Sequence, residues 1–332
     1  MIHTEKNNIK SKIDLPKYGL GCANLGNLYI NISNKESDDI IKNAFKEKIN
    51  YFDTAPLYGN GLSEHRLGSY FADNEISDDF VISTKVGKLV KPVQDPSSFT
   101  KSTQLYCNYD YTYDGIMRSI EDSLNRLRLN KIDIVYLHDL TPFYNEDTKN
   151  EFYTAMKFGI KALDKLKTEK VIKLVGLGEN DFHVCNASLD YYNYDLFLIA
   201  GRYTIFEQTI SEEFFGKCEK YDTAIVLGGP LNSGLMSNNK ISSVKYNYTD
   251  APLEIINKSS EIKKICNKYN INPISAALQF PIFNKIIKTV LFGIQNQAEI
   301  NQNIEYIHQK IPKEFWTEMK KRGFIKQFCP IS

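Results

Sequence analysis

Four polar residues follow short apolar stretches in a pattern that could transfer a proton. Asp53 ends NYFD, Lys85 ends VISTK and His138 ends IVYLH, while Tyr58 lies five residues beyond Asp53. A phenol with a reference pKa of about 10 exchanges protons poorly at neutral pH, but a neighbouring ammonium favours its phenolate form. A carboxylate would hold that ammonium in place, and an imidazole could donate to a substrate oxygen or relay the proton. Together the four residue types predict a proton-transfer site.

Each of these residues also has an ordinary structural explanation. Asp53 could cap the next helix, Lys85 could extend its ammonium to solvent, and His138 could be a structural imidazole behind an apolar run. Tyr58 is one of 21 tyrosines in the chain. The prediction therefore depends on the combination of all four at successive strand ends, which is a known catalytic location.

The elements that would position these residues are read from the alternation of apolar and amphipathic segments. Short apolar runs predict strands at 18–22, 50–54, 80–85, 132–138, 172–177, 196–200, 224–228 and 289–292. Helical patterns lie between them, for example at 37–48 and at 114–127. Eight β-then-α units favour an α/β fold of the closed (β/α)8 TIM-barrel type over an open doubly wound sheet. Such a barrel brings the C-terminal ends of its strands to one rim.

The length of 332 residues fits a single barrel domain over 1–332, because no Pro/Gly/Ser linker or internal repeat divides the chain. Two segments, 87–109 and 231–252, are too long for ordinary βα loops. Both leave the C-terminal ends of predicted strands, so we expect them to form substrate loops or lids.

Charge and cysteine usage exclude several classes of partner. The 41 Lys and Arg nearly balance 40 Asp and Glu, and a net charge of +1 predicts binding to neither nucleic acid nor a membrane surface. A polar N-terminal stretch without a long apolar run predicts a cytoplasmic protein. The six cysteines are scattered without a CxxC motif, which predicts reduced thiols and no metal site. The oligomeric state cannot be read from the sequence.

The motifs that carry these residues resemble the aldo-keto reductases over nearly the whole chain. The matching strings are YGLG at 18–21, FDTAPLYG at 52–59, LSEHRLG at 62–68, STKVG at 83–87, RSIEDSLNRLRLNKIDIVYLHD at 118–139, VGLGEN at 175–180, PLNSGL at 230–235 and FGIQNQAEINQN at 292–303. The resemblance implies a barrel oxidoreductase that uses a nicotinamide cofactor without a Rossmann domain. It also implies that Tyr58 is the proton donor or acceptor, that Lys85 and Asp53 tune it, and that His138 orients the substrate carbonyl.

Finer strings, including DYTYDGIMRSIEDSLNRL, LIAGRYTIFEQ and PKEFWTEMKKRGFI, resemble the branch of the family that contains L-fucose (D-threo-aldose) 1-dehydrogenase and pyridoxal 4-dehydrogenase. This resemblance implies oxidation of the C1 hydroxyl of an aldose to a lactone, with hydride transfer to NAD or NADP. A pyridoxal dehydrogenase or a general aldehyde or ketone reductase of the same family is the alternative. A nicotinamide-sensing binding subunit is an alternative from another class.

The resemblance also implies cofactor-binding positions. They are Gly21, Asp53, Asn180, Gly229, Leu231, Ser233, Gly293, Glu299 and Asn303. Asn180 would hold the nicotinamide carboxamide, although Glu179 precedes it where the family commonly has Ser, and Asn180 could instead cap a helix. Gly228 aligns with an aromatic residue that usually stacks on the nicotinamide.

Two further residues bear on the choice of cofactor and substrate. Glu299 aligns with a basic residue of many NADPH-using members, and a carboxylate repels a 2′-phosphate but accepts a hydrogen bond from the 2′-hydroxyl of NAD. We therefore expect NAD to be preferred over NADP, unless Glu299 only occupies the first turn of the last helix. Arg202 is predicted to bind a small-molecule sugar or aldehyde together with Tyr58 and His138, or else to be a solvated, ion-paired residue.

Overall fold

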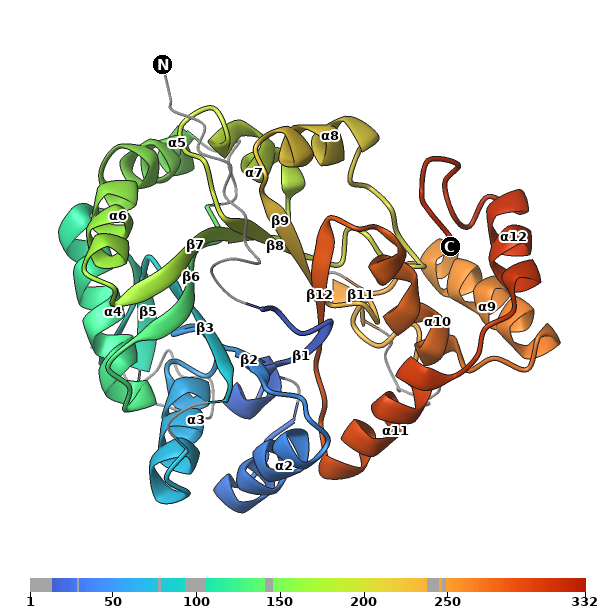
Figure 1. Ribbon diagram of the computed structural model, residues 1–332, viewed down its shortest axis with the longest axis horizontal. Helices are drawn as coiled ribbons and strands as arrows, with labels where there is room; N and C mark the ends of the chain where they lie inside the picture. The colour runs from blue at the N-terminus through green and yellow to red at the C-terminus, as the bar shows by residue number, and fades with distance from the viewer. Residues whose placement is uncertain are drawn as a thin grey trace.

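A closed barrel of eight parallel strands forms the centre of the computed structural model, which describes residues 14–28, 30–76, 79–92, 105–140, 146–237, 245–246 and 249–332 (Figure 1). The barrel strands are Tyr18–Gly21 (β1), Tyr51–Asp53 (β2), Val81–Val86 (β3), Ile132–His138 (β6), Ile172–Glu179 (β7), Leu196–Ala200 (β8), Ala224–Gly228 (β9) and Ile287–Phe292 (β12). Strand β1 pairs with both β2 and β12, which closes the ring. All eight predicted strands are present, and the predicted (β/α)8 barrel is confirmed.

Helices surround the barrel as an outer layer (Figure 1). They are Asn34–Lys46 (α2), Leu62–Asp73 (α3), Tyr113–Leu127 (α4), Glu146–Thr154 (α5), Ile160–Thr168 (α6), Phe182–Ser188 (α7), Glu212–Lys220 (α8), Leu253–Lys268 (α9), Pro273–Gln279 (α10), Gln297–His308 (α11) and Lys313–Lys321 (α12). Shorter helical segments lie at Cys22–Gly26 (η1), Ala155–Gly159 (η3) and Phe280–Phe283 (η4). Because strands and helices alternate, the barrel is covered by a layer that buries the outward side chains of its strands.

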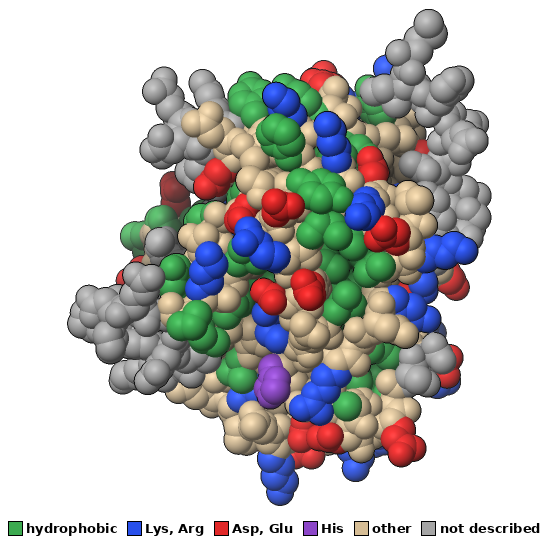
Figure 2. Space-filling view, turned by 90° about the vertical axis from the view of Figure 1, so that its left-hand side faces the viewer, with side chains coloured by type: hydrophobic (Ala, Val, Ile, Leu, Met, Phe, Trp, Pro, Cys, Tyr) green, Lys and Arg blue, Asp and Glu red, His purple; other side chains and the backbone are tan. Residues whose placement is uncertain are grey.

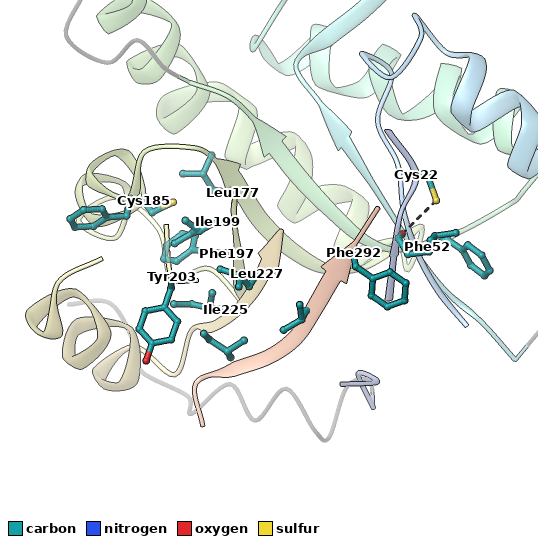
Figure 3. Packing of buried hydrophobic residues seen from close by; sticks show 14 of the residues in the cluster. Cys22, Phe52, Leu177, Cys185, Phe197, Ile199, Tyr203, Ile225, Leu227 and Phe292 are labelled. Atoms are coloured by element: carbon teal, nitrogen blue, oxygen red, sulfur yellow. Dashed lines mark hydrogen bonds between the residues drawn. The ribbon is translucent and has the colours of Figure 1, made fainter. Parts of the chain in front are cut away.

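The larger core lies between the barrel and these helices. Figure 3 shows Leu177, Phe197, Ile199, Ile225 and Leu227 on neighbouring strands β7, β8 and β9, all within this buried cluster. Their strands are buried on both faces, which explains why they read in the sequence as continuous apolar runs without alternation.

A second core fills the barrel interior. Tyr51 and Tyr136 lie there with their hydroxyl oxygens 3.3 Å apart, surrounded by aliphatic residues. Gly176 on β7 makes room for one of them, because a Cβ at this position would lie 2.5 Å from a ring carbon of Tyr136 and 2.6 Å from the backbone oxygen of Leu196. The interior is therefore packed, and open space for a ligand can exist only at its ends.

Local signals at the helix ends explain where the helices begin. Helix α2 starts at Asn34, three residues before the predicted start, because Ser33 and Glu36 form a reciprocal capping box. Helix α4 starts one residue before the predicted boundary, and the side chain of Thr112 accepts a hydrogen bond from the Gly115 amide.

The first long segment folds back on itself. Lys88–Pro92 (β4) and Leu105–Tyr109 (β5) form an antiparallel hairpin, whereas 93–104 lie outside the described residues. In the second, Lys245–Tyr246 (β10) pairs with Thr249–Asp250 (β11), and 238–244 and 247–248 are not described. The role of either segment as a lid stays a prediction.

The surface of the described residues mixes charges of both signs. On the face in Figure 2, acidic and basic side chains are interspersed with apolar ones. Among the described helices, none is long and apolar enough to cross a membrane. In the same part of the chain, no group of three or more His, Cys, Asp and Glu side chains is placed to hold a metal ion. All six cysteines are free thiols.

Candidate active site

Asp53 and Lys85 form a buried ion pair at the C-terminal ends of β2 and β3. The Lys85 Nζ lies 2.7 Å from Oδ2 of Asp53 and also donates to the Thr54 backbone oxygen at 2.8 Å. The other Asp53 oxygen accepts a hydrogen bond from the Ser83 hydroxyl at 2.7 Å. Only 2% of the Lys85 side chain and 4% of the Asp53 side chain are exposed. Asp53 therefore does not cap the next helix, and the Lys85 ammonium does not extend to solvent. These were the structural alternatives that the sequence left open for the two residues.

Tyr58 lies directly beside this pair. The Lys85 Nζ is 4.6 Å from the centre of the Tyr58 ring, so the ammonium group faces the phenol from a short distance. The ring of His138 stands edge-on to the Tyr58 ring, with 6.2 Å between ring centres. The four residues singled out from the sequence therefore come together at one end of the barrel.

His138 ends strand β6 and has a charged neighbour that sequence reasoning did not assign. Its Nε2 lies 3.3 Å from Oδ2 of Asp139, and the same oxygen accepts a hydrogen bond from Lys88 Nζ at 2.8 Å. The Tyr111 hydroxyl donates to the His138 backbone oxygen at 2.6 Å and fixes the end of the strand. Burial lowers the pKa of His138 well below 6.5, and Lys88 and Lys85 lower it further against the opposing effect of Asp139. At neutral pH the imidazole is therefore uncharged.

A pocket of about 300 Å³ opens at this end of the barrel. It contains Tyr58, Lys85 and His138 together with Asp139, Glu179 and Asn180. The rest of its wall is small or apolar, formed by Ala23, Leu28, Leu57, Gly59, Gly178, Leu198 and Ala200. A pocket of this kind, mostly apolar with a few convergent polar groups, is typical of a small-molecule site.

Asn180 lines this pocket and does not cap the following helix. Helix α7 is instead capped by Asp181, whose side chain accepts a hydrogen bond from the His183 amide. The backbone oxygen of Asn180 accepts a hydrogen bond from Arg202 Nε at 2.7 Å, and Arg202 Nη1 pairs with Glu207 at 3.0 Å. Arg202 therefore fixes the backbone at Asn180, and its predicted contact with substrate stays a prediction.

The loop after β9 carries three of the implied cofactor positions. Gly229 is exposed with a φ of 61°, a conformation that favours glycine, and Ser233 also has a positive φ of 57°. Leu231 is half-buried between them. The loop is held to the end of β8 by Asn232, which accepts a hydrogen bond from Thr204 and donates to the Gly201 backbone oxygen.

The remaining implied cofactor positions lie at the ends of the first and last barrel strands and in helix α11. Gly21 ends β1 and Gly293 directly follows β12. The two lie side by side, because a Cβ added to Gly293 would be 3.9 Å from the backbone oxygen of Gly21. Glu299 occupies the first turn of α11, where its carboxylate accepts hydrogen bonds from the Gln295 amide and the Asn296 side chain. Asn303 is buried one turn further on. Glu299 thus occupies the first helical turn, as one of the two readings of the sequence expected, and the preference for NAD stays a prediction.

Sequence reasoning missed Lys88 and Asp139 as part of the site. Asp139 follows His138 directly, but its φ of 47° turns the chain sharply after the strand. Val86 and Leu137 are register partners in β3 and β6, so Lys88 and Asp139 each lie two residues beyond a matched pair. The register of β3 against β6 is the signal that could have placed Lys88 beside Asp139. It is known only from the folded barrel and cannot be read from the sequence.

Comparisons with known proteins identify the family of the chain. The aldo/keto reductase family profile matches residues 17–322. The chain belongs to the aldo/keto reductase family. A pyridoxal 4-dehydrogenase of Microbacterium luteolum is 34% identical, over 92% of this chain and 94% of that protein. A D-threo-aldose 1-dehydrogenase of a Pseudomonas species is 32% identical, over 98% of this chain and 99% of that protein.

Solved structures match the fold of this aldo/keto reductase. An aldo-keto reductase from Bacillus halodurans superposes with a TM-score of 0.72 at 22% identity, covering 94% of this chain and 93% of that one. A glycerol dehydrogenase from Gluconobacter oxydans superposes with a TM-score of 0.71 at 19% identity, covering 93% of this chain and 92% of that one. As a member of the family, the protein is an NAD(P)-dependent oxidoreductase, which confirms the enzyme class implied by the sequence motifs.

Proposed function

We propose that this aldo/keto reductase oxidises the hydroxyl group of a cyclic hemiacetal, such as C1 of an aldose, to a lactone. The observation that carries the proposal is the buried Asp53–Lys85 ion pair with its ammonium 4.6 Å from the Tyr58 ring. A fixed positive charge beside a phenol stabilises the phenolate, which is the base that an alcohol oxidation requires. The pyridoxal and D-threo-aldose dehydrogenases named above are relatives whose names give pyridoxal and an aldose as substrates, and both compounds can close to a cyclic hemiacetal.

The residues present fit a nicotinamide cofactor. Gly178, Leu198 and Ala200 give the pocket a small, apolar wall suited to a flat ring, and Asn180 lines the same pocket with its side chain not engaged in the cap of α7. In our proposal Asn180 holds the carboxamide and the loop with Gly229, Leu231 and Ser233 holds the pyrophosphate. Gly21, Gly293, Glu299 and Asn303 hold the remainder. When bound, the cofactor supplies the acceptor for the hydride that leaves the hemiacetal carbon.

The protein's own residues handle the proton. Tyr58 removes the hydroxyl proton of the substrate as the C–H bond breaks and the C=O bond of the lactone forms. Lys85 stabilises the phenolate that accepts this proton, and Asp53 fixes the Lys85 ammonium. His138 is neutral and donates one hydrogen bond to the substrate oxygen without adding a charge. In the reverse direction the same residues would reduce a lactone or an aldehyde.

A cyclic substrate with an apolar face suits this pocket. Leu28 and Leu57 stand at the pocket as partly exposed apolar side chains, and Leu198 lines its wall. Such a lining packs against the C–H face of a sugar ring or against an aromatic ring. A pyridoxal-type substrate is therefore the second candidate, and the substrate panel below distinguishes it from an aldose.

For the cofactor we propose NAD. The carboxylate of Glu299 lies in the first turn of α11, where a 2′-phosphate would meet its negative charge. Glu299→Gln keeps a hydrogen-bonding side chain at the helix cap and removes only the charge. We expect kcat/KM with NADP to rise in this variant while that with NAD changes little. A wild-type protein that prefers NADP would contradict the assignment.

The function is tested by mixing the purified protein with NAD or NADP and following the absorbance of the reduced cofactor. The panel contains L-fucose, D-arabinose, L-galactose and pyridoxal, with 1,5-anhydro sugars as controls because they lack the C1 hydroxyl. We expect turnover with at least one hemiacetal, none with the controls, and a lactone product by mass spectrometry. Tight cofactor binding without turnover on any of the panel would instead favour a nicotinamide-sensing binding protein.

A further inference from the structure

Lys88 and Asp139 form an ion pair beside His138 that the proposed proton transfer does not use. Lys88 is 2% exposed although it carries a charge, and its Nζ lies 2.8 Å from Oδ2 of Asp139. The Tyr109 ring covers the ammonium at 5.4 Å. Burying a charged lysine costs desolvation energy even when it is paired with a carboxylate, so its placement next to a reacting group calls for an explanation.

The hairpin of β4 and β5 places this lysine. Gly87 turns the chain between β3 and β4 with a φ of 96°, and any side chain there would collide with the Tyr111 ring. The Asp110 amide donates to the Gly87 backbone oxygen at 2.9 Å and closes the base of the hairpin. Lys88 is therefore held rigidly at the first position after the turn, directly across from Asp139.

The two ring nitrogens of His138 have different surroundings. Its Nδ1 is buried and has no hydrogen-bond partner among the described residues, whereas Nε2 lies 3.3 Å from the Asp139 carboxylate. A neutral imidazole carries one proton, on one nitrogen only. A proton on Nδ1 would be a buried, unpaired donor, and the lone pair of Nε2 would then face a negative oxygen.

We propose that Lys88 and Asp139 are positioning residues that keep the single proton of His138 on Nε2, the nitrogen available to a substrate oxygen. The 3.3 Å contact is longer than the roughly 2.7–2.9 Å of a charge-assisted hydrogen bond, so the Nε2 proton is free to be donated elsewhere. Lys88 neutralises the carboxylate enough that it orients the imidazole without drawing a second proton onto it.

The two members of the pair act on His138 in opposite directions. Asp139 raises the pKa of the imidazole, whereas Lys88 and Lys85 lower it. Among the described residues, the other titratable groups around His138 are Tyr58 from the loop after β2, Glu179 on β7, which accepts from the Leu140 amide, and Tyr111. None of these three changes in the variants below.

The test is the protonation state of His138, read by ¹⁵N NMR of histidine-labelled full-length protein, with the His138 signals assigned by their loss in His138→Gln. In the wild type at neutral pH we expect the Nε2–H tautomer alone. Lys88→Met should keep this tautomer and raise the pKa of His138. Asp139→Asn should weaken the preference, so that the Nδ1–H tautomer becomes detectable beside Nε2–H, and should lower the pKa. Lys91→Met replaces an exposed lysine on the same strand and should leave all His138 signals unchanged.

A general loss of structure would shift the pKa of His138 in the same direction in both variants. Opposite shifts in Lys88→Met and Asp139→Asn therefore cannot arise from it. A wild-type Nδ1–H tautomer, or an unchanged tautomer in Asp139→Asn, would overturn the proposal. If Asp139→Asn does not fold, the wild-type tautomer and the direction of the change in Lys88→Met still decide it.

The inference deepens the proposed function, but the NMR result does not need turnover and can fail or succeed independently of it. Where turnover is found, Asp139→Asn should lower kcat about tenfold or more with little change in the Kd for cofactor, because a positioned proton donor contributes about 10²–10⁴-fold. An unchanged kcat would contradict the positioning role.

Discussion

Replacing Asp53 with Asn leaves the Lys85 ammonium in a buried position without its counter-charge. Both side chains are at most 4% exposed, and among the described residues the Nζ would keep only its hydrogen bond to the Thr54 backbone oxygen, at 2.8 Å. Breaking a buried pair by removing one partner costs about 3–5 kcal/mol of unfolding free energy. At about 1.4 °C per kcal/mol for a domain of this length, Tm should fall by about 4–7 °C.

Two further variants separate the ion pair from general effects. Asp53→Asn combined with Lys85→Met removes both charges and should recover most of the lost stability but none of the lost activity. Glu261→Gln breaks a pair of similar length, 2.6 Å to Lys264, whose side chains are 49% and 71% exposed. This control should cost less than about 1 kcal/mol.

Calorimetry or fluorescence-monitored thermal unfolding measures these changes at one scan rate for all variants. If Asp53→Asn lowers the unfolding free energy no more than Glu261→Gln does, the reasoning is refuted. Such a result would mean that the Lys85 ammonium remains solvated without its partner. Recovery of activity in the double variant would show that the Lys85 charge has no part in the chemistry.

Two more predictions concern packing and pH. Gly176→Ala should lower the unfolding free energy by about 1–3 kcal/mol in chemical denaturation, because its Cβ would lie 2.5 Å from a Tyr136 ring carbon. Gly178→Ala, with its nearest contact at 3.5 Å, should cost less, and equal losses would contradict the packing argument. His138 has a pKa well below 6.5 when folded, so the unfolded chain binds an extra proton below that pH and stability falls as the pH drops from about 7 to 5. The slope from this residue is at most about 1.4 kcal/mol per pH unit, and His138→Asn should remove it; an identical pH dependence in the variant would show that His138 is not buried in its neutral form.

The barrel could be predicted from the sequence because each parallel strand is buried on both faces. The bounds of β6, β8 and β9 agree with their predicted runs, since apolar residues in such strands are continuous and end where the chain reaches the rim. The start of α2 differs because a capping box between Ser33 and Glu36 outweighs the apolar periodicity that marks the body of the helix.

The sequence predicted the site residues that lie at or near the ends of strands, because a polar residue in that position is itself a sign of a catalytic group. Asp53 and His138 end their strands and Lys85 is the last residue but one of β3, and parallel strands meet at the same rim. Lys88 and Asp139 are 51 positions apart, and their contact depends on the register of β3 against β6 and on the turn at Gly87. The sequence left two roles open for Arg202, substrate binding or an ion pair. The structure shows the ion pair with Glu207 and a hydrogen bond to the Asn180 backbone oxygen, and the contact with substrate stays a prediction.

The central claim is that Tyr58 moves the proton in an NAD(P)-dependent oxidation. The most direct measurement is single-turnover reduction of the cofactor by Tyr58→Phe on the best substrate of the panel, alongside the Kd for the cofactor by fluorescence titration. Because the variant lacks only the phenolic oxygen, the rate of the chemical step should fall by about 10²–10⁴-fold while the Kd stays close to that of the wild type. A chemical step that runs at nearly the wild-type rate would contradict the claim.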